Sequence, residues 1–275
     1  MHLNFHFTTV QTLWTLTFAA LLVLLVVLLG RDRTKRFPWF TASIVIVALN
    51  LLANRLLYGK LPQMTMSAIY IVMSDIAALV AFVVLVEVAR RVFAGAGRFA
   101  WMVWTLVLLA IAGAVLAKWG PWPAWATLTA NSTIGRLSAL QLVAQKLGLF
   151  NDVVTVGLGL LVVLFGRRYG AGWRSHAQQI MIGLSTASIG QLAVEGIWQT
   201  IAKSAAPKSM EEYQHIVGLR DKLFNTNSVV YIVVLVWWIV CLWRDEPGAA
   251  VAEAGATAPV HEMLESAEPS EGVEE

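Results

Sequence analysis

The chain has 275 residues, of which 58% are hydrophobic and only 13% are charged. Soluble domains carry roughly 25% charged residues, so this composition excludes an ordinary water-soluble globular domain. The apolar residues also come in long blocks, and blocks of about 18 residues or more are typical of membrane-spanning helices.

The net charge of +3 hides an uneven distribution. Residues 245–275 contain nine acidic residues and no Lys or Arg, which leaves 20 basic and 8 acidic residues in residues 1–244. We therefore expect a transmembrane domain over 1–244 and a disordered, acidic, cytoplasmic tail over 245–275, because the tail has few large apolar residues with which to fold. The basic body suits the anionic head groups of membrane lipids. Its Lys and Arg residues lie singly or in pairs at the ends of apolar blocks, a pattern that does not indicate nucleic-acid binding.

Seven apolar blocks follow one another along the chain, and none shows the alternation with period two that marks a membrane β-barrel. The predicted fold is an all-α, polytopic membrane bundle of seven transmembrane helices. The blocks cover residues 8–29, 38–58, 68–89, 100–117, 147–166, 177–201 and 224–243.

The flanking charges predict an orientation with the N-terminus outside and the C-terminus inside. Residues 1–10 contain no Lys or Arg, so the first block differs from a cleaved signal peptide, which has a positive region before its apolar stretch. Short, basic loops belong on the cytoplasmic side. With the N-terminus outside, those loops contain Arg31, Arg33, Lys35, Arg36, Arg90, Arg91, Arg98, Arg167, Arg168, Arg174 and Arg244.

Two outer loops carry helical signals of their own. Apolar residues from Leu137 to Leu147 recur at helical spacing and predict a helix that leads into the fifth block. Ser209 and Glu212 form a capping-box pattern. We expect a short amphipathic helix after them, lying on the membrane or over the mouth of the bundle.

Small residues within two blocks indicate where helices approach closely. Glycine lets the backbones of transmembrane helices come near one another. The best candidates for such contacts are Gly157 and Gly159 in the fifth block and Gly183 and Gly190 in the sixth.

Polar residues inside membrane spans are a functional-site hypothesis by default, and here they gather in five blocks. On the rise of a helix, Asp75, Glu195 and Asp152 lie about 7–10 Å from the outer end of their spans, and Arg55 lies about 5 Å deep. The candidate ligand-binding residues are Asn50, Asn54, Arg55, Asp75, Asp152, Gln191, Glu195, Gln199, Asn225, Asn227 and Tyr231.

This cluster has two interpretations. It can form a pocket open to the outside for a small polar or cationic ligand, since its three acids outnumber its one Arg and give a net negative charge when all are ionised. A carboxylate that burial keeps protonated would instead suit a proton-coupled step. The alternative is that these Asn, Gln and ion-pair contacts only hold helices together.

Several function classes lack the residues they require. A retinal-binding protein needs a Lys in the middle of its last span, but Lys222 lies at the outer edge of the seventh block. Zinc hydrolases and haem cytochromes need intramembrane His, whereas all five His lie in tails, loops or span ends. No G-x-S-x-G pattern is present. We therefore expect no catalytic residues, cofactor or metal.

The predicted function is a non-enzymatic, multi-pass protein of the plasma membrane that senses or binds a ligand in an outward-facing polar pocket. In topology alone, the layout resembles receptor bundles and membrane sensor modules. The short tail is too small for an output domain, so we expect a cytoplasmic or membrane protein partner. The alternative is a small-solute or proton-coupled transporter that uses Asp75, Asp152 and Glu195.

Overall fold

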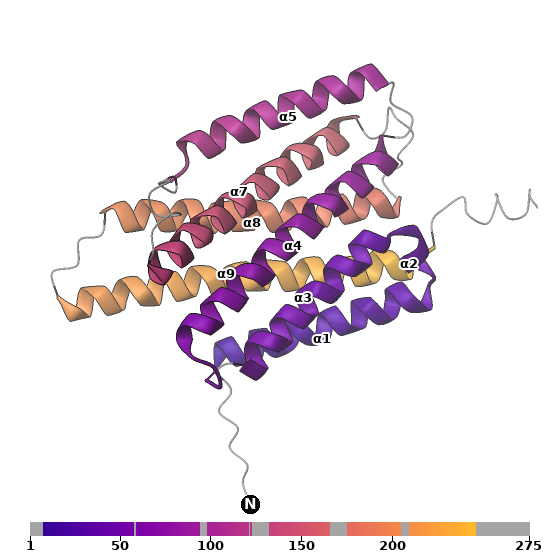
Figure 1. Cartoon of the computed structure of the whole chain (residues 1–275). Coiled ribbons are helices and arrows are strands. Elements are labelled where there is room, and N and C mark those ends of the chain that lie inside the picture. Colours follow the sequence, from indigo (N-terminus) through magenta and orange to yellow (C-terminus); the bar gives the residue numbers. More distant parts are fainter. Residues whose placement is uncertain are drawn as a thin grey trace, which may run out of the picture. The chain divides into compact units, whose positions relative to one another are not determined.

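The computed structural model describes residues 8–57, 59–93, 98–120, 122, 132–165, 175–204 and 209–245, and Figure 1 shows that the regular elements in these ranges are helices. The chain divides into two compact units, Met1–Trp243 and Arg244–Glu275. All of these helices belong to the first unit. In chain order they are α1 (Thr9–Gly30), α2 (Arg33–Arg36), α3 (Pro38–Leu57), α4 (Gln63–Val92), α5 (Arg98–Lys118), α7 (Thr133–Phe165), α8 (His176–Ser204) and α9 (Met210–Trp243).

The second unit contributes only Arg244 and Asp245 to the described part of the chain. The acidic tail that the composition predicts to be disordered, from Glu246 onward, lies outside the described residues.

Within the described ranges, six helices are long and apolar enough to cross a membrane: α1, α3, α4, α7, α8 and α9. The protein is thus of the helical, multi-pass membrane type that its composition predicts. The fourth predicted span corresponds to α5, whose apolar stretch, Met102–Lys118, is shorter than in the other six.

The six long helices close into a ring within the first unit. Each packs against two ring neighbours in the order α1, α3, α4, α7, α8, α9 and back to α1, and α4 also touches α8. Helix α5 lies outside this ring and packs mainly against α7, as Figure 1 shows. The ring therefore depends on contacts between helices that are distant in sequence, such as α1 with α9.

Local signals define where the helices begin and end. Thr8 and Gln11 cap α1 reciprocally through their side chains and backbone N–H groups. Helix α3 begins at Pro38, a residue favoured in the first turn because its missing N–H would have no helical partner. Close to that end, the N–H of Phe40 donates to Glu87 of α4 at 3.2 Å, so a carboxylate from a neighbouring helix helps to cap α3.

Helices α7 and α9 are much longer than the apolar blocks that predict them, at 33 and 34 residues. The helix predicted before the fifth block is confirmed, and it continues into α7 without a break. The separate amphipathic helix expected after Ser209 is wrong. Its Ser209 cap does form, with the hydroxyl accepting from Glu212 N at 3.2 Å, but the helix that starts there runs on to Trp243 as α9. A continuous helix keeps its backbone hydrogen-bonded throughout, which a break at the bundle mouth would sacrifice.

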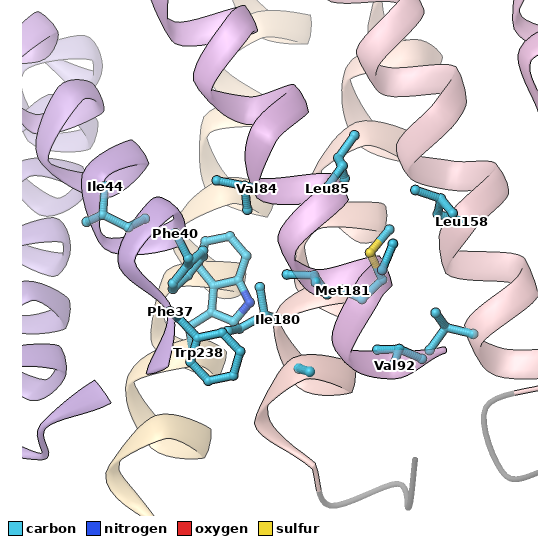
Figure 2. Packing of buried hydrophobic residues seen from close by; sticks show 14 of the residues in the cluster. Phe37, Phe40, Ile44, Val84, Leu85, Val92, Leu158, Ile180, Met181 and Trp238 are labelled. Atoms are coloured by element: carbon cyan, nitrogen blue, oxygen red, sulfur yellow. The ribbon is translucent and has the colours of Figure 1, made fainter. Parts of the chain in front are cut away.

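The two ends of the ring differ in character. We call them the Thr9 end, where α1, α4, α7 and α9 begin, and the Trp243 end, where these four helices finish. Most of the fully buried apolar side chains lie toward the Trp243 end. In Figure 2, Trp238 of α9 lies against Phe40 of α3, and their rings meet edge to face with centroids 5.1 Å apart. The apolar packing is thus concentrated at the end opposite the ionisable residues of the predicted site.

Close approach at the four glycines is confirmed. A Cβ at Gly157 would collide with Leu108, one at Gly159 with Ser185, and one at Gly183 with the ring of Trp238. A Cβ at Gly190 would lie 3.0 Å from Asn227 Oδ1. These glycines set the spacing of α7 and α8 from their neighbours.

Candidate functional site

A cavity of about 470 Å³ lies toward the Thr9 end, between α4, the end of α5, α7, α8 and α9. Ligand pockets typically measure about 300–1,000 Å³, so the space suits a small molecule. Its polar and aromatic lining consists of Tyr70, Ser74, Trp119, Gln141, Gln145, Lys146, Asp152, Gln191, Glu195, Trp198, Gln199, Arg220 and Phe224.

The deepest acid of the cavity, Asp152, is fixed by a contact between α7 and α8. Its Oδ1 accepts a hydrogen bond from Ser188 Oγ at 2.7 Å. One turn further along, Ser185 Oγ donates to the Thr155 carbonyl at 3.1 Å, and Gly159 leaves room for this close approach. The α7–α8 seam thus holds the Asp152 carboxylate in place.

Glu195 lies on α8 nearer the Thr9 end. Its Oε1 accepts from Gln199 Nε2 at 3.2 Å, one turn away on the same helix. Beside it, the Trp119 ring lies over Gly196, where an added Cβ would be only 3.5 Å from the ring. Trp119 thus lines the cavity while packing against the backbone of α8.

Lys146 is 9% exposed and joins α7 to the end of α5. Its ammonium group donates to the carbonyls of Leu116 at 3.0 Å and Gly120 at 3.5 Å, and also to that of Trp119. The last carbonyls of a helix lack intrahelical partners and carry partial negative charge, which favours a cation. Gly120, with φ +70°, ends the α5 segment in the left-handed conformation that glycine adopts readily.

Arg220 lies at the rim on α9, in the part of that helix that precedes the apolar block. Its guanidinium lies 5.4 Å from the ring of Trp198 and 5.5 Å from that of Phe224. Such cation–π contacts hold a guanidinium over aromatic faces. Arg220 forms no ion pair with a carboxylate of the described residues.

A smaller hollow of about 260 Å³ adjoins the cavity and shares Tyr70, Ile71 and Gln141 with it. Asn54 of α3 lines this hollow. The amide of Asn54 donates to Asn50 Oδ1 at 3.1 Å, one turn away on the same helix. These two predicted site residues are thus hydrogen-bonded to each other beside the cavity.

The structure separates the predicted site residues into groups. Asp152, Gln191, Glu195 and Gln199 line the cavity, and Asn54 lines the smaller hollow. The remaining candidates line neither space: Asn50, Arg55, Asp75, Asn225, Asn227 and Tyr231.

Several residues of the last group have structural contacts instead. Asn227 of α9 donates to Gln191 Oε1 of α8 at 2.6 Å and so joins these helices at the cavity wall. Arg55 is exposed, with its guanidinium 5.9 Å from the ring of Trp14. Tyr231 packs against the apolar core. Of these three contacts, only the Asn227–Gln191 hydrogen bond is of the helix-joining kind.

Asp75 has a different environment. Its Oδ1 is buried and has no hydrogen-bond partner among the described residues. Buried polar atoms usually have a partner. Helix-to-helix hydrogen bonding therefore does not account for this oxygen of Asp75. It lies next to Ser74, which lines the cavity.

The cavity also contains residues that the sequence reasoning left out of the site, chiefly Lys146, Arg220, Gln141 and Gln145. All four lie in the helical extensions of α7 and α9, which the sequence predicts as helices in the outer loops and not as parts of the spans. The sequence feature that indicates them is the helical spacing that continues beyond each apolar block.

These additions alter the expected charge of the pocket. Asp152 and Glu195 contribute two negative charges, and Lys146 and Arg220 contribute two positive charges. With all four groups ionised the lining is neutral, whereas the sequence predicts a net negative pocket. The difference arises because Asp75 and Arg55 do not line the cavity and two unexpected cations do.

No group of three or more His, Cys, Asp or Glu side chains within the described residues is arranged to hold a metal ion. No protein-family model matches the chain, and no curated protein or solved structure is found to be similar to it.

Proposed function

We propose that the chain crosses a plasma membrane seven times, with its N-terminus outside, and that α5 makes the fourth crossing. At 21 residues α5 rises about 31 Å, which matches a hydrocarbon core of about 30 Å. Basic residues at the Trp243 end, including Arg31, Lys35 and Arg91, favour placing that end in the cytoplasm. In a bacterium this membrane would be the inner one.

Within that topology we propose that the protein is a non-enzymatic ligand-sensing or binding module. The observation that carries this proposal is the cavity of about 470 Å³, lined by charged side chains from α7, α8 and α9 and by two tryptophans. It takes up a small polar ligand from the outer side. A cytoplasmic or membrane protein partner, contacting the basic residues of the Trp243 end, receives the signal.

Ligand-dependent stabilisation tests this proposal. The full chain in uncharged detergent is heated with each member of a library of small polar compounds, and at least one compound should raise the melting temperature. Saturating ligand at 100 times its Kd adds about 2.7 kcal/mol to the free energy of unfolding. Asp152→Asn and Glu195→Gln should weaken the effect, whereas Glu211→Gln, at an exposed residue outside the cavity, should not.

A second pair of variants tests whether the cavity itself is the binding place. Gly196→Leu would add a large side chain beside Trp119, which lines the cavity, and should obstruct it, whereas a Cβ added at Gly113 on α5 meets nothing within 4 Å. If a stabilising compound acts equally on both variants, it binds elsewhere. If no compound in the library stabilises the protein, the proposal is wrong.

A small-solute or proton-coupled transporter is a second candidate. The buried, unpartnered Oδ1 of Asp75 favours it, because a carboxyl without a partner is suited to taking up a proton. This candidate predicts solute flux into proteoliposomes that Asp75→Asn abolishes. Binding to the cavity without any flux would support the sensing module instead.

A further inference from the structure

The charges of the cavity are arranged in order of depth. Arg220 contacts Trp198 at the rim, and Glu195 lies three residues before Trp198 on α8, about 4.5 Å deeper along the helix axis. Asp152 lies opposite Ser188, seven residues before Glu195 and about 10 Å deeper still. A positive group therefore stands above two negative ones.

The two cations differ in what they can offer a ligand. An ammonium group has three donors, and the ammonium of Lys146 already contacts three carbonyls at the end of α5. The guanidinium of Arg220 contacts the rings of Trp198 and Phe224 and forms no ion pair with a carboxylate of the described residues, and its five N–H donors include the fork that matches an anionic group. Arg220 is thus the cation of the cavity that can bind an anionic group.

The acids retain accepting capacity. A carboxylate offers about four lone-pair positions. Glu195 accepts from Gln199, and Asp152 accepts from Ser188, each through one oxygen. Both can accept further hydrogen bonds from a ligand ammonium group.

We propose that the ligand is a zwitterion, with its anionic group on Arg220 and its ammonium group on Glu195. This inference rests on the proposed binding function of the cavity and names its ligand class. A ligand with one charge could pair with only one of Arg220 and Glu195, whereas a zwitterion can form a charge-assisted contact with each. The rings of Trp119, Trp198 and Tyr70 line the same space and suit an apolar or aromatic portion.

Two sources share this chemistry. A free amino acid places an ammonium and a carboxylate a few ångströms apart, and a zwitterionic lipid head group places an ammonium and a phosphate similarly. Phenylalanine represents the first source and glycerophosphoethanolamine the second. Phenethylamine and 3-phenylpropionate are the single-charge analogues of phenylalanine.

The test measures the affinity of these four probes for the full chain in uncharged detergent by calorimetry. A hydrogen bond to a charged group contributes about 1.5–3 kcal/mol, so at least one zwitterion should bind roughly 10- to 100-fold more tightly than either single-charge analogue. Preference for phenylalanine identifies a soluble ligand, and preference for glycerophosphoethanolamine identifies a head group.

Variants of Arg220 and Glu195 test which residue binds each charged group of the ligand. Arg220→Gln should remove the advantage of the zwitterion over the amine, and Glu195→Gln should remove its advantage over the carboxylate. The matched controls are Arg31→Gln, which alters an arginine–tryptophan contact at the opposite end of the ring, and Glu211→Gln. Both controls should leave the affinities unchanged.

The inference is overturned if a single-charge analogue binds as tightly as both zwitterions, or if neither zwitterion binds. In either case the library measurement still decides the broader proposal, because a compound of another class that stabilises the wild type and fails with Glu195→Gln would show that the cavity binds ligands. Loss of affinity in the Arg31→Gln control would also contradict the assignment to Arg220.

Discussion

Lys146 shows how a single charged side chain inside a membrane bundle is accommodated. Its sequence position suggests a loop cation, yet the side chain is almost fully buried and donates to three carbonyls at the end of α5. Since α5 packs mainly on α7, this contact is one of those that hold it against the ring. The residue therefore links an outer helix to the cavity wall.

Lys146→Met tests that link. The variant leaves carbonyls at the end of α5 without a donor, so we expect the free energy of unfolding to fall by about 1–3 kcal/mol. Thermal and denaturant unfolding in detergent measure this change. Lys60→Met, at an exposed lysine between α3 and α4, should alter stability by less than about 0.5 kcal/mol. Equal stability of the two variants would show that the Lys146 contact is not structural.

A variant of Asn151 tests the interpretation that polar side chains join neighbouring helices by hydrogen bonds. Its amide donates to the Ala78 carbonyl of α4 at 2.6 Å and so joins α7 to α4. We expect Asn151→Ala to lower the free energy of unfolding by about 0.6–1.7 kcal/mol, the range measured for hydrogen bonds between membrane helices. Asn225→Ala is the control, because Asn225 makes no hydrogen bond within the described residues. The same loss in both variants would count against the interhelical bond.

At the scale of helices, a glycine on one helix packs against a large aromatic ring on its neighbour. Trp238 is 2% exposed, with its ring on Phe40 and its edge against Gly183 of α8. A Cβ at position 183 would overlap this ring, so a side chain there requires α8 or Trp238 to move. The tight α8–α9 contact therefore depends on the absence of a Cβ.

Gly183→Leu should destabilise the bundle by about 1–3 kcal/mol or more through overpacking. Gly113→Leu on α5 is the matched control, because a Cβ there meets nothing within 4 Å. That change should be neutral or slightly stabilising, since leucine favours the helix over glycine by roughly 0.5–1 kcal/mol. The free energies of unfolding of both variants are compared in detergent. A neutral result for Gly183→Leu would show that the α8–α9 contact does not depend on glycine at this position.

At the scale of the whole molecule, the number of membrane crossings depends on whether α5 spans the bilayer. Between Lys60 and Glu211 the chain runs through α4, α5, α7 and α8. Four crossings place these two residues on the same side of the membrane, whereas three crossings, with α5 outside the bilayer, place them on opposite sides.

Single-cysteine labelling decides between these topologies. In a Cys241→Ser background, Lys60→Cys and Glu211→Cys should both react with a membrane-impermeant maleimide added to intact cells. Lys35→Cys, at an exposed position between α1 and α3, should react only after the cells are opened. Reaction of Lys60→Cys but not Glu211→Cys from outside would show that α5 does not cross.

The sequence by itself determined the helical membrane class, the apolar segments of the helices and the outer placement of the ionisable residues. These properties follow from local hydropathy and helical spacing, which each segment carries without reference to the others. The close-packing glycines were also identifiable, because small residues in apolar spans indicate close backbone approach wherever they occur.

Only the tertiary structure decided which polar residues share a cavity. Depth along a span can be counted from the sequence, but the direction of a side chain depends on how each helix is rotated against its neighbours. Asp75 and Asp152 were predicted at similar depth, yet only Asp152 lines the space. The sequence predicts a helix before the fifth block and another after Ser209, but not that either would line the cavity. The packing of α7 and α9 against the other helices brings Lys146 and Arg220 to it.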